Sequence, residues 1–104
     1  MTTWLVTRHP GAIEWIRTQQ IPIDKQVDHL DIKSISAGDT VIGILPVNLA
    51  AEVCLRGGTY INLSTNVPIN ARGREMTSNE LDQYEARLEC YAISRIPNPL
   101  DRKE

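Results

Sequence analysis

Short apolar runs rich in β-branched residues alternate along this chain with segments whose apolar residues recur at helical spacing. The strand-like runs span 3–7, 40–45 and 59–63, and a helical pattern begins after each of them. An alternation of this kind favours right-handed crossovers and a mainly parallel sheet with helices on both faces. We therefore predict a compact α/β domain built as a three-layer sandwich.

The first strand-like run passes through polar residues directly into a helix. Its carboxyl end is formed by Thr7, Arg8 and His9. Pro10 suits the first turn of a helix because its missing N–H has no partner to lose there, and the pattern predicts a helix over 10–20. Residues 26–30 are predicted to form a short strand at the edge of the sheet.

The central strand is predicted at 40–45, because a nearly continuous apolar run is typical of a parallel strand covered on both faces. Asn48 follows where a helix cap belongs. The strand at 59–63 opens into a loop, 64–76, that exceeds the roughly two to six residues usual for such a connection. Loops of this length are often functional.

A capping box formed by Thr77 and Glu80 predicts the start of a final helix. The core stripe of that helix is predicted to be Leu81, Tyr84, Leu88 and Tyr91. Residues 1–96 would then form a single domain, followed by a frayed tail at 97–104.

Composition narrows the classes of protein to consider. A chain of 104 residues that is 41% hydrophobic and 23% charged fits one soluble globular domain. A net charge of -2 argues against broad binding to duplex nucleic acid, although a small nucleotide stays open. Because the sequence shows neither a secretory signal nor about 20 consecutive apolar residues, we expect a cytoplasmic protein without a membrane partner.

Several conspicuous side chains are assigned to the core. Cys54 and Cys90 lie in apolar helical patterns without metal-ligand spacing and are predicted to be buried free thiols. Trp4 and Trp15 are predicted to be core residues rather than stacking platforms for bases. His29 has no companion motif and is assigned a structural role.

Polar residues gather where predicted strands end, and in an open parallel sheet the ligand crevice lies beyond those ends. The clusters are Thr7-Arg8-His9, Pro46-Val47-Asn48 and Ser64-Thr65-Asn66. Two of them lead directly into helices, whose free N–H groups and positive dipole ends would face an anion. A phosphorylated ligand fits this arrangement. Arg8 and His9 would supply a positive fork and a group that moves protons near neutral pH.

Each of these residues also has an ordinary structural interpretation. Arg8 and His9 could cap the helix or pair with Glu14, and Asn48 could serve only as a cap. Ser64 and Thr65 could simply terminate a strand. The two arginines that flank Gly73 in the long loop, Arg72 and Arg74, could close over an anion or could be solvated on a turn.

The sequence contains no phosphate-binding loop with its lysine, no dinucleotide glycine fingerprint, no nucleophile elbow and no cluster of metal ligands. We therefore expect neither a cofactor nor a metal. A catalyst built from positioned arginine, histidine and hydroxyl groups suits cleavage of an RNA-type phosphodiester by its own 2′-hydroxyl.

Three stretches, 4–15, 38–54 and 71–77, resemble a small CRISPR-associated accessory family that accompanies type III systems. The first contains Trp-x-Val-Thr-Arg-His-Pro-Gly-Ala, from Trp4 to Ala12. The resemblance implies a Rossmann-like, CARF-like domain and a role in cyclic oligoadenylate signalling. It implies a ring nuclease that opens cyclic tetra-adenylate into linear di-adenylates ending in a 2′,3′-cyclic phosphate, which switches the antiviral response off. A homodimer would place two sites around the two-fold-symmetric ring.

Under this hypothesis, the catalytic residues are Arg8, His9 and Arg72. The ligand-binding residues are Thr7, Pro10, Gly11, Asn48, Ser64, Thr65 and Arg74. Two alternatives stay open: a module that sequesters the ring without cutting it, and a protein-interaction subunit that docks Arg72 and Arg74 on an acidic surface.

Overall fold

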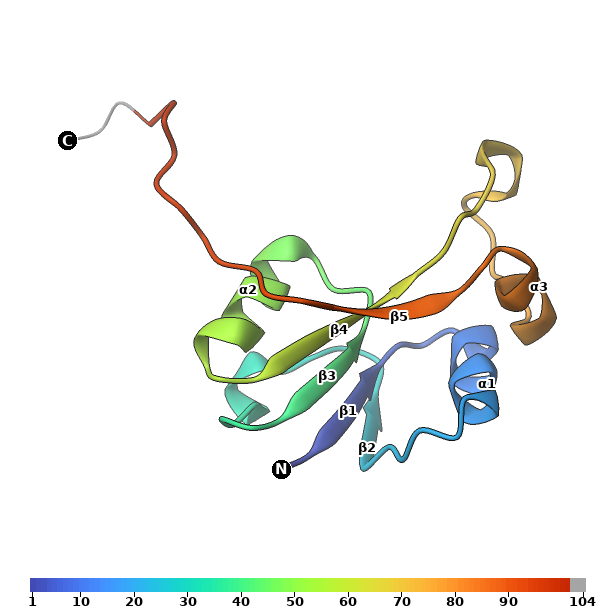
Figure 1. Cartoon of the computed structure of the whole chain (residues 1–104), viewed down its shortest axis with the longest axis horizontal. Helices are drawn as coiled ribbons and strands as arrows, with labels where there is room; N and C mark the ends of the chain where they lie inside the picture. The colour runs from blue at the N-terminus through green and yellow to red at the C-terminus, as the bar shows by residue number, and fades with distance from the viewer. Residues whose placement is uncertain (102–104) are drawn as a thin grey trace.

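The protein folds as an α/β domain around one sheet (Figure 1), and the computed structural model describes residues 1–101. The strands are β1 (Thr3–Val6), β2 (Lys25–Val27), β3 (Thr40–Gly43), β4 (Thr59–Ser64) and β5 (Arg87–Tyr91). The helices are α1 (Pro10–Thr18), α2 (Val47–Leu55) and α3 (Ser78–Gln83), with 3₁₀ turns η1 (Ile32–Ser34) and η2 (Ile69–Ala71).

The sheet has the strand order β2-β1-β3-β4-β5. The first four strands are parallel to their neighbours, and β5 runs antiparallel to β4 at one edge. The mainly parallel sheet is confirmed. The arrangement is compatible with a small Rossmann-like domain.

Side chains alternate between the two faces of the sheet and pack into two separate cores. On one face, Trp4, Val41 and Tyr60 pack with Ala50 and Val53 of α2. The other core combines Leu5, Ile42 and Leu63 from the strands with Ala12, Trp15 and Ile16 from α1 and Leu81 from α3. Helices therefore cover both faces, and the predicted three-layer arrangement is confirmed.

Both tryptophans are buried, as predicted, and both indoles have carboxylate partners. Trp4 Nε1 donates to Asp39 Oδ2 at 3.3 Å, and Trp15 Nε1 donates to Asp82 Oδ1 at 2.7 Å. The cysteines are free thiols, as predicted, but their predicted burial is wrong, because Cys54 is only half-buried and Cys90 is exposed on β5.

The predicted final helix is wrong beyond its first turns. The capping box of Thr77 and Glu80 is present, but α3 ends at Gln83 and residues 87–91 form β5. In this segment the side chains alternate with a period of two: Leu88 packs toward the α1 core while Arg87 faces the other way beside Ser64. Pairing with β4 supplies backbone hydrogen bonds that a helix would have left unmade at that edge of the sheet.

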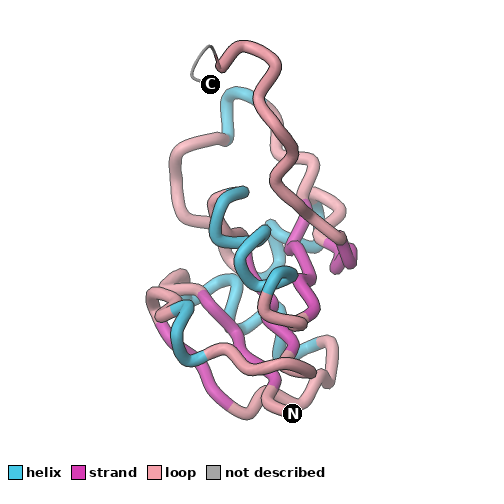
Figure 2. Tube along the Cα trace, turned by 90° about the vertical axis from the view of Figure 1, so that its left-hand side faces the viewer, coloured by secondary structure: helices cyan, strands magenta, loops and turns pink. Residues whose placement is uncertain are grey.

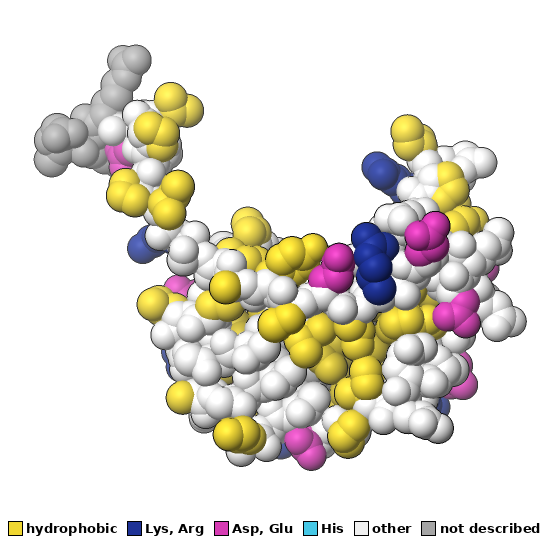
Figure 3. Space-filling model, viewed as in Figure 1, with side chains coloured by type: hydrophobic (Ala, Val, Ile, Leu, Met, Phe, Trp, Pro, Cys, Tyr) yellow, Lys and Arg dark blue, Asp and Glu magenta, His cyan; other side chains and the backbone are white. Residues whose placement is uncertain are grey.

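Beyond β5 the chain leaves the body of the domain. Ile96 and Leu100 on this segment are 75% and 84% exposed. Figures 1 and 3 show this segment rising at one end of the β4–β5 pair and the loop with η2 rising at the other, with a saddle between them. In Figure 2 the same segment is the loop that climbs away from the strands. Of the tail predicted at 97–104, the last three residues lie outside the described part of the chain.

The central strand should carry much of the stability. Ile42, at 1% exposure, lies in the middle of the core against α1, so Ile42→Ala should cost about 2–5 kcal/mol of unfolding free energy in a urea titration. Leu55 on α2 is 79% exposed and provides the control, because Leu55→Ala should change that free energy by less than about 0.5 kcal/mol. Equal losses for the two variants would contradict this assignment of the core.

Candidate functional site

The strand order creates a point at which two neighbouring chain connections diverge. From β1 the chain passes through α1 to β2, and from β3 it passes through α2 to β4 on the opposite face of the sheet. In doubly wound sheets, ligands bind in the crevice that opens at the carboxyl ends of such a strand pair. A cavity of about 770 Å³ lies there, a size suited to a small ligand.

Four parallel strands and the long loop contribute residues to this cavity. The strand ends supply Thr7, Arg8 and His9 after β1, Asp28 and His29 after β2, Ile44, Leu45 and Pro46 after β3, and Thr65 after β4. The loop supplies Arg72, Gly73, Arg74, Glu75 and Met76. The structure brings together at this cavity six of the residues named from the sequence: Thr7, Arg8, His9, Thr65, Arg72 and Arg74.

The floor of the cavity depends on a close approach between β1 and β3. A Cβ at Gly43 would lie 2.5 Å from the carbonyl oxygen of Val6, so only glycine allows this spacing. Beyond Gly43, the exit of β3 is held by Tyr60: the Leu45 N–H donates to its hydroxyl at 3.1 Å. Burial raises the pKa of Tyr60, and its phenol remains a neutral hydrogen-bonding group.

Arg8 presents a charge that the protein itself does not neutralise. Its side chain makes no hydrogen bond or ion pair with any other residue in the range 1–101. Glu14 was the alternative partner considered from the sequence, but its Oε2 lies 3.5 Å from Nη1 of Arg17 instead. The guanidinium at the cavity is therefore available to an anion, for which its planar set of donors is well suited.

His9 is held by two contacts. Its backbone N–H donates to Thr7 Oγ1 at 3.1 Å, and its ring nitrogen Nδ1 lies 3.3 Å from Glu75 Oε1 in the loop. His9 occupies the N-cap position of α1 without a side-chain cap bond, so its ring does not serve as a cap. When Nδ1 donates to the carboxylate, the acceptor lone pair of the imidazole lies on Nε2.

The end of the long loop is pressed against the start of α1. A Cβ at Gly11 would lie 1.7 Å from the carbonyl oxygen of Met76, so glycine is required for this approach. Arg74 Nη2 donates to Glu80 Oε2 at 2.6 Å, which ties the loop to the first turn of α3. Arg72 Nε donates to the Val67 carbonyl at 3.3 Å and is otherwise exposed.

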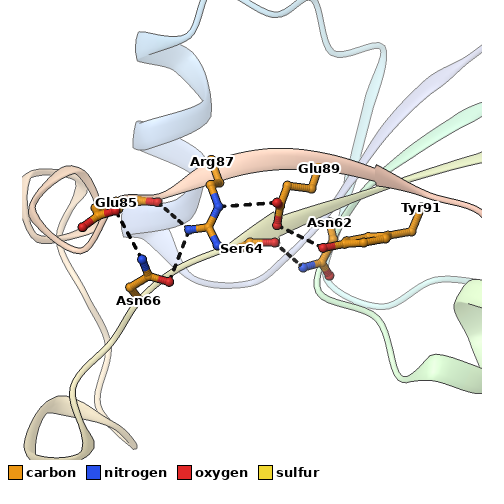
Figure 4. A network of polar contacts seen from close by, with 7 residues as sticks. All are labelled: Asn62, Ser64, Asn66, Glu85, Arg87, Glu89 and Tyr91. Atoms are coloured by element: carbon orange, nitrogen blue, oxygen red, sulfur yellow. Dashed lines mark hydrogen bonds and ion pairs between the residues drawn. The ribbon is translucent and has the colours of Figure 1, made fainter.

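A polar network fixes the start of the same loop (Figure 4). The Asn66 N–H donates to the Tyr84 carbonyl at 2.7 Å, and the Asn66 side chain meets Glu85 and Arg87 at 3.3 and 3.4 Å. Ser64 belongs to this network, where its hydroxyl accepts from Asn62 Nδ2 at 2.9 Å. Contacts at both ends thus fix the backbone of the loop, and this determines where its arginines reach the cavity.

Four residues assigned to the ligand from sequence do not line the cavity: Pro10, Gly11, Asn48 and Ser64. Asn48 is the second residue of α2 and exposed, because Pro46 takes the N-cap position. Gly11 instead sets the position of the loop. The cavity contains Asp28, His29 and Glu75, which sequence reasoning missed. The first two were missed because the strand was predicted at 26–30, whereas β2 ends at Val27 and leaves both residues beyond its carboxyl end.

Arginine and histidine outnumber carboxylates around this cavity. Arg8, His9, His29, Arg72 and Arg74 face Asp28 and Glu75. This balance, together with the unpaired Arg8, favours an anionic ligand with polar groups.

Among the described residues, no three His, Cys, Asp or Glu side chains are grouped to hold a metal ion. No helix within 1–101 is long and apolar enough to cross a membrane.

Comparison with protein families identifies relatives of this chain. Residues 4–94 match the family described as "Putative CRISPR-associated protein (Cas_VVA1548)". The chain belongs to this CRISPR-associated family. The match covers the sheet except its first residue, Thr3, and includes every strand end at the cavity, so the candidate site lies within the part that matches the family. No curated protein and no solved structure matches the chain.

The Arg74–Glu80 contact predicts a pH dependence of stability. The hydrogen bond from Arg74, with the Thr77 N–H second, lowers the pKa of Glu80 from 4.5 to about 2. A carboxyl whose pKa is depressed by folding stabilises the fold above its unfolded pKa and loses that contribution as pH falls. The difference in unfolding free energy between the unmodified protein and the Glu80→Gln variant should therefore be largest at neutral pH and shrink as the pH falls from 4.5 to 2. A difference that is constant with pH in chemical denaturation would contradict the contact.

Proposed function

We propose that this member of the CRISPR-associated family is a ring nuclease that binds cyclic tetra-adenylate and opens it, which switches off type III CRISPR signalling. The family membership supports a role beside CRISPR systems. The main support for the proposal is the cavity at the β1–β3 divergence. The unpaired Arg8 and the tethered His9 line it together with the loop residues Arg72 and Arg74. A phosphodiester of an adenylate ring is an anion of matching chemistry, and the CARF-like character of the domain is part of the proposal.

The proposed reaction is an in-line attack by a ribose 2′-hydroxyl on the adjacent phosphorus. A new P–O2′ bond forms, the P–O5′ bond breaks, and the products end in a 2′,3′-cyclic phosphate and a 5′-hydroxyl. Nε2 of His9 takes the proton of the 2′-hydroxyl, while Arg8 and Arg72 stabilise the charge on the phosphate oxygens. Thr7 and Thr65 are the hydroxyl groups at the cavity that can hold the ribose. This chemistry requires neither a metal nor an outside nucleophile.

The proposed assembly is a homodimer. Cyclic tetra-adenylate has two-fold symmetry, and a dimer formed about a two-fold axis would offer it two copies of the cavity. Each copy would hold one scissile phosphate, so two cuts would release two linear di-adenylates. The proposed partners are thus the ring ligand and a second copy of the chain.

The test is incubation of the protein with labelled cyclic tetra-adenylate in excess chelator, with products resolved by chromatography over many turnovers. We expect linear di-adenylate with a 2′,3′-cyclic phosphate. Intact ligand that co-elutes with the protein would overturn catalysis in favour of a sequestering module. Intact ligand that never binds would overturn both and favour the protein-interaction subunit.

Arg8→Ala provides the residue-level prediction for this assay. Removal of the unpaired guanidinium should lower the cleavage rate by about 10²-fold or more, because each positioned donor to the phosphate contributes on this scale. Arg56 ends α2 outside the cavity, and Arg56→Ala makes the same change of charge as a control. Equal activity of the two variants would remove Arg8 from the site.

A further inference from the structure

His9 and His29 both line the cavity, and beyond them the chain turns toward opposite faces of the sheet. Their strands are adjacent, since the Thr7 N–H donates to the Val27 carbonyl at 3.0 Å, and each histidine lies two residues beyond that contact. After His9 the chain turns into α1, whose Ala12 belongs to the core with α3. After His29 the chain turns the other way, because Leu30 and Ile32 pack on the core with α2.

The two histidines differ in what holds them. The His9 ring is held through Nδ1 by Glu75, and this leaves Nε2 as its single acceptor nitrogen. The side chain of His29 forms no hydrogen bond or ion pair within residues 1–101, although it lines the same cavity and is exposed. Both of its ring nitrogens are therefore available to a ligand or to solvent.

We propose that His29 is a catalytic residue, the general acid opposite His9, an assignment that rests on the proposed ring cleavage. As the P–O5′ bond breaks, protonated His29 gives its proton to the leaving 5′ oxygen, while His9 holds the proton taken from the 2′-hydroxyl. One proton is lost and one gained by the protein, so exchange with water resets both rings. The arrangement suits an in-line displacement, which needs its base and its acid on opposite sides of the phosphorus.

The charged groups around the two histidines come from the ends of β1 and β2 and from the long loop. Arg8 and Asp28 are at the strand ends, and Arg72, Arg74 and Glu75 are in the loop. A mechanism with one histidine as base and the other as acid gives a bell-shaped rate profile, with the role of His9 on the acidic limb and that of His29 on the basic limb.

The decisive experiment compares two substrates. His29→Ala and His29→Gln should each cut cyclic tetra-adenylate about 10²- to 10⁴-fold more slowly, with binding of the uncleavable 2′-deoxy ring retained. A ring whose bridging 5′ oxygens are replaced by sulfur has a leaving group that needs no proton. On that ring, both His29 variants should approach the rate of the unmodified protein, whereas His9→Ala should stay slow. The basic limb of the pH profile should vanish only in the His29 variants.

Controls separate this assignment from the proposed function. Lys33→Ala changes an exposed residue of η1 outside the cavity and should leave the rate unchanged. Thermal unfolding checks that the variants fold. If the protein cleaves the ring and the His29 variants cleave it equally fast, or if sulfur gives no rescue, the general acid is another group and the proposed function stands. If the unmodified protein does not cleave the ring, the proposed function fails and this assignment fails with it.

Discussion

The pairing of β1 with β3 is the contact on which the rest of the structure depends. Both strands are buried on their two faces, and they lie side by side because Gly43 places no Cβ against the Val6 carbonyl. Their connections then leave toward opposite faces, since α1 and α2 must cover separate apolar surfaces. The cavity between the diverging strand ends is a consequence of that division, and Arg8 and Asp28 are the charged residues that follow the strands there.

The long loop supplies the remaining wall of the site, and its position depends on contacts at both ends. Asn66 joins it to the turn before β5, and the approach of Met76 to Gly11 presses it against α1. Glu75 thereby reaches His9. The site thus combines elements that are distant in sequence, and β5 contributes by anchoring the loop rather than by touching the cavity.

Much of the architecture could be predicted from local patterns, because β1, β3 and β4 are short runs rich in apolar and β-branched residues and Thr77 with Glu80 is a strong helix start. The strand-end rule predicted that Arg8 and His9 lie at a crevice beyond the sheet, and the structure places both at the cavity. β5 was missed because its apolar residues also fit helical spacing. The choice between helix and strand depends on a distant part of the chain, the edge of β4 that β5 pairs with. Asn48 and Ser64 were assigned to the ligand from sequence position alone, but helix phase and strand alternation turn them away from the cavity.

The central claim is that the cavity at the β1–β3 divergence binds an adenylate ring. The most direct measurement is a titration of isotope-labelled protein with the 2′-deoxy form of cyclic tetra-adenylate, followed through backbone amide chemical shifts. The account predicts the largest changes at Arg8 and His9, at residues 43–45 and at residues 72–76. Binding that leaves these amides unchanged, or shifts confined to α2 and the outer face of β5, would contradict it.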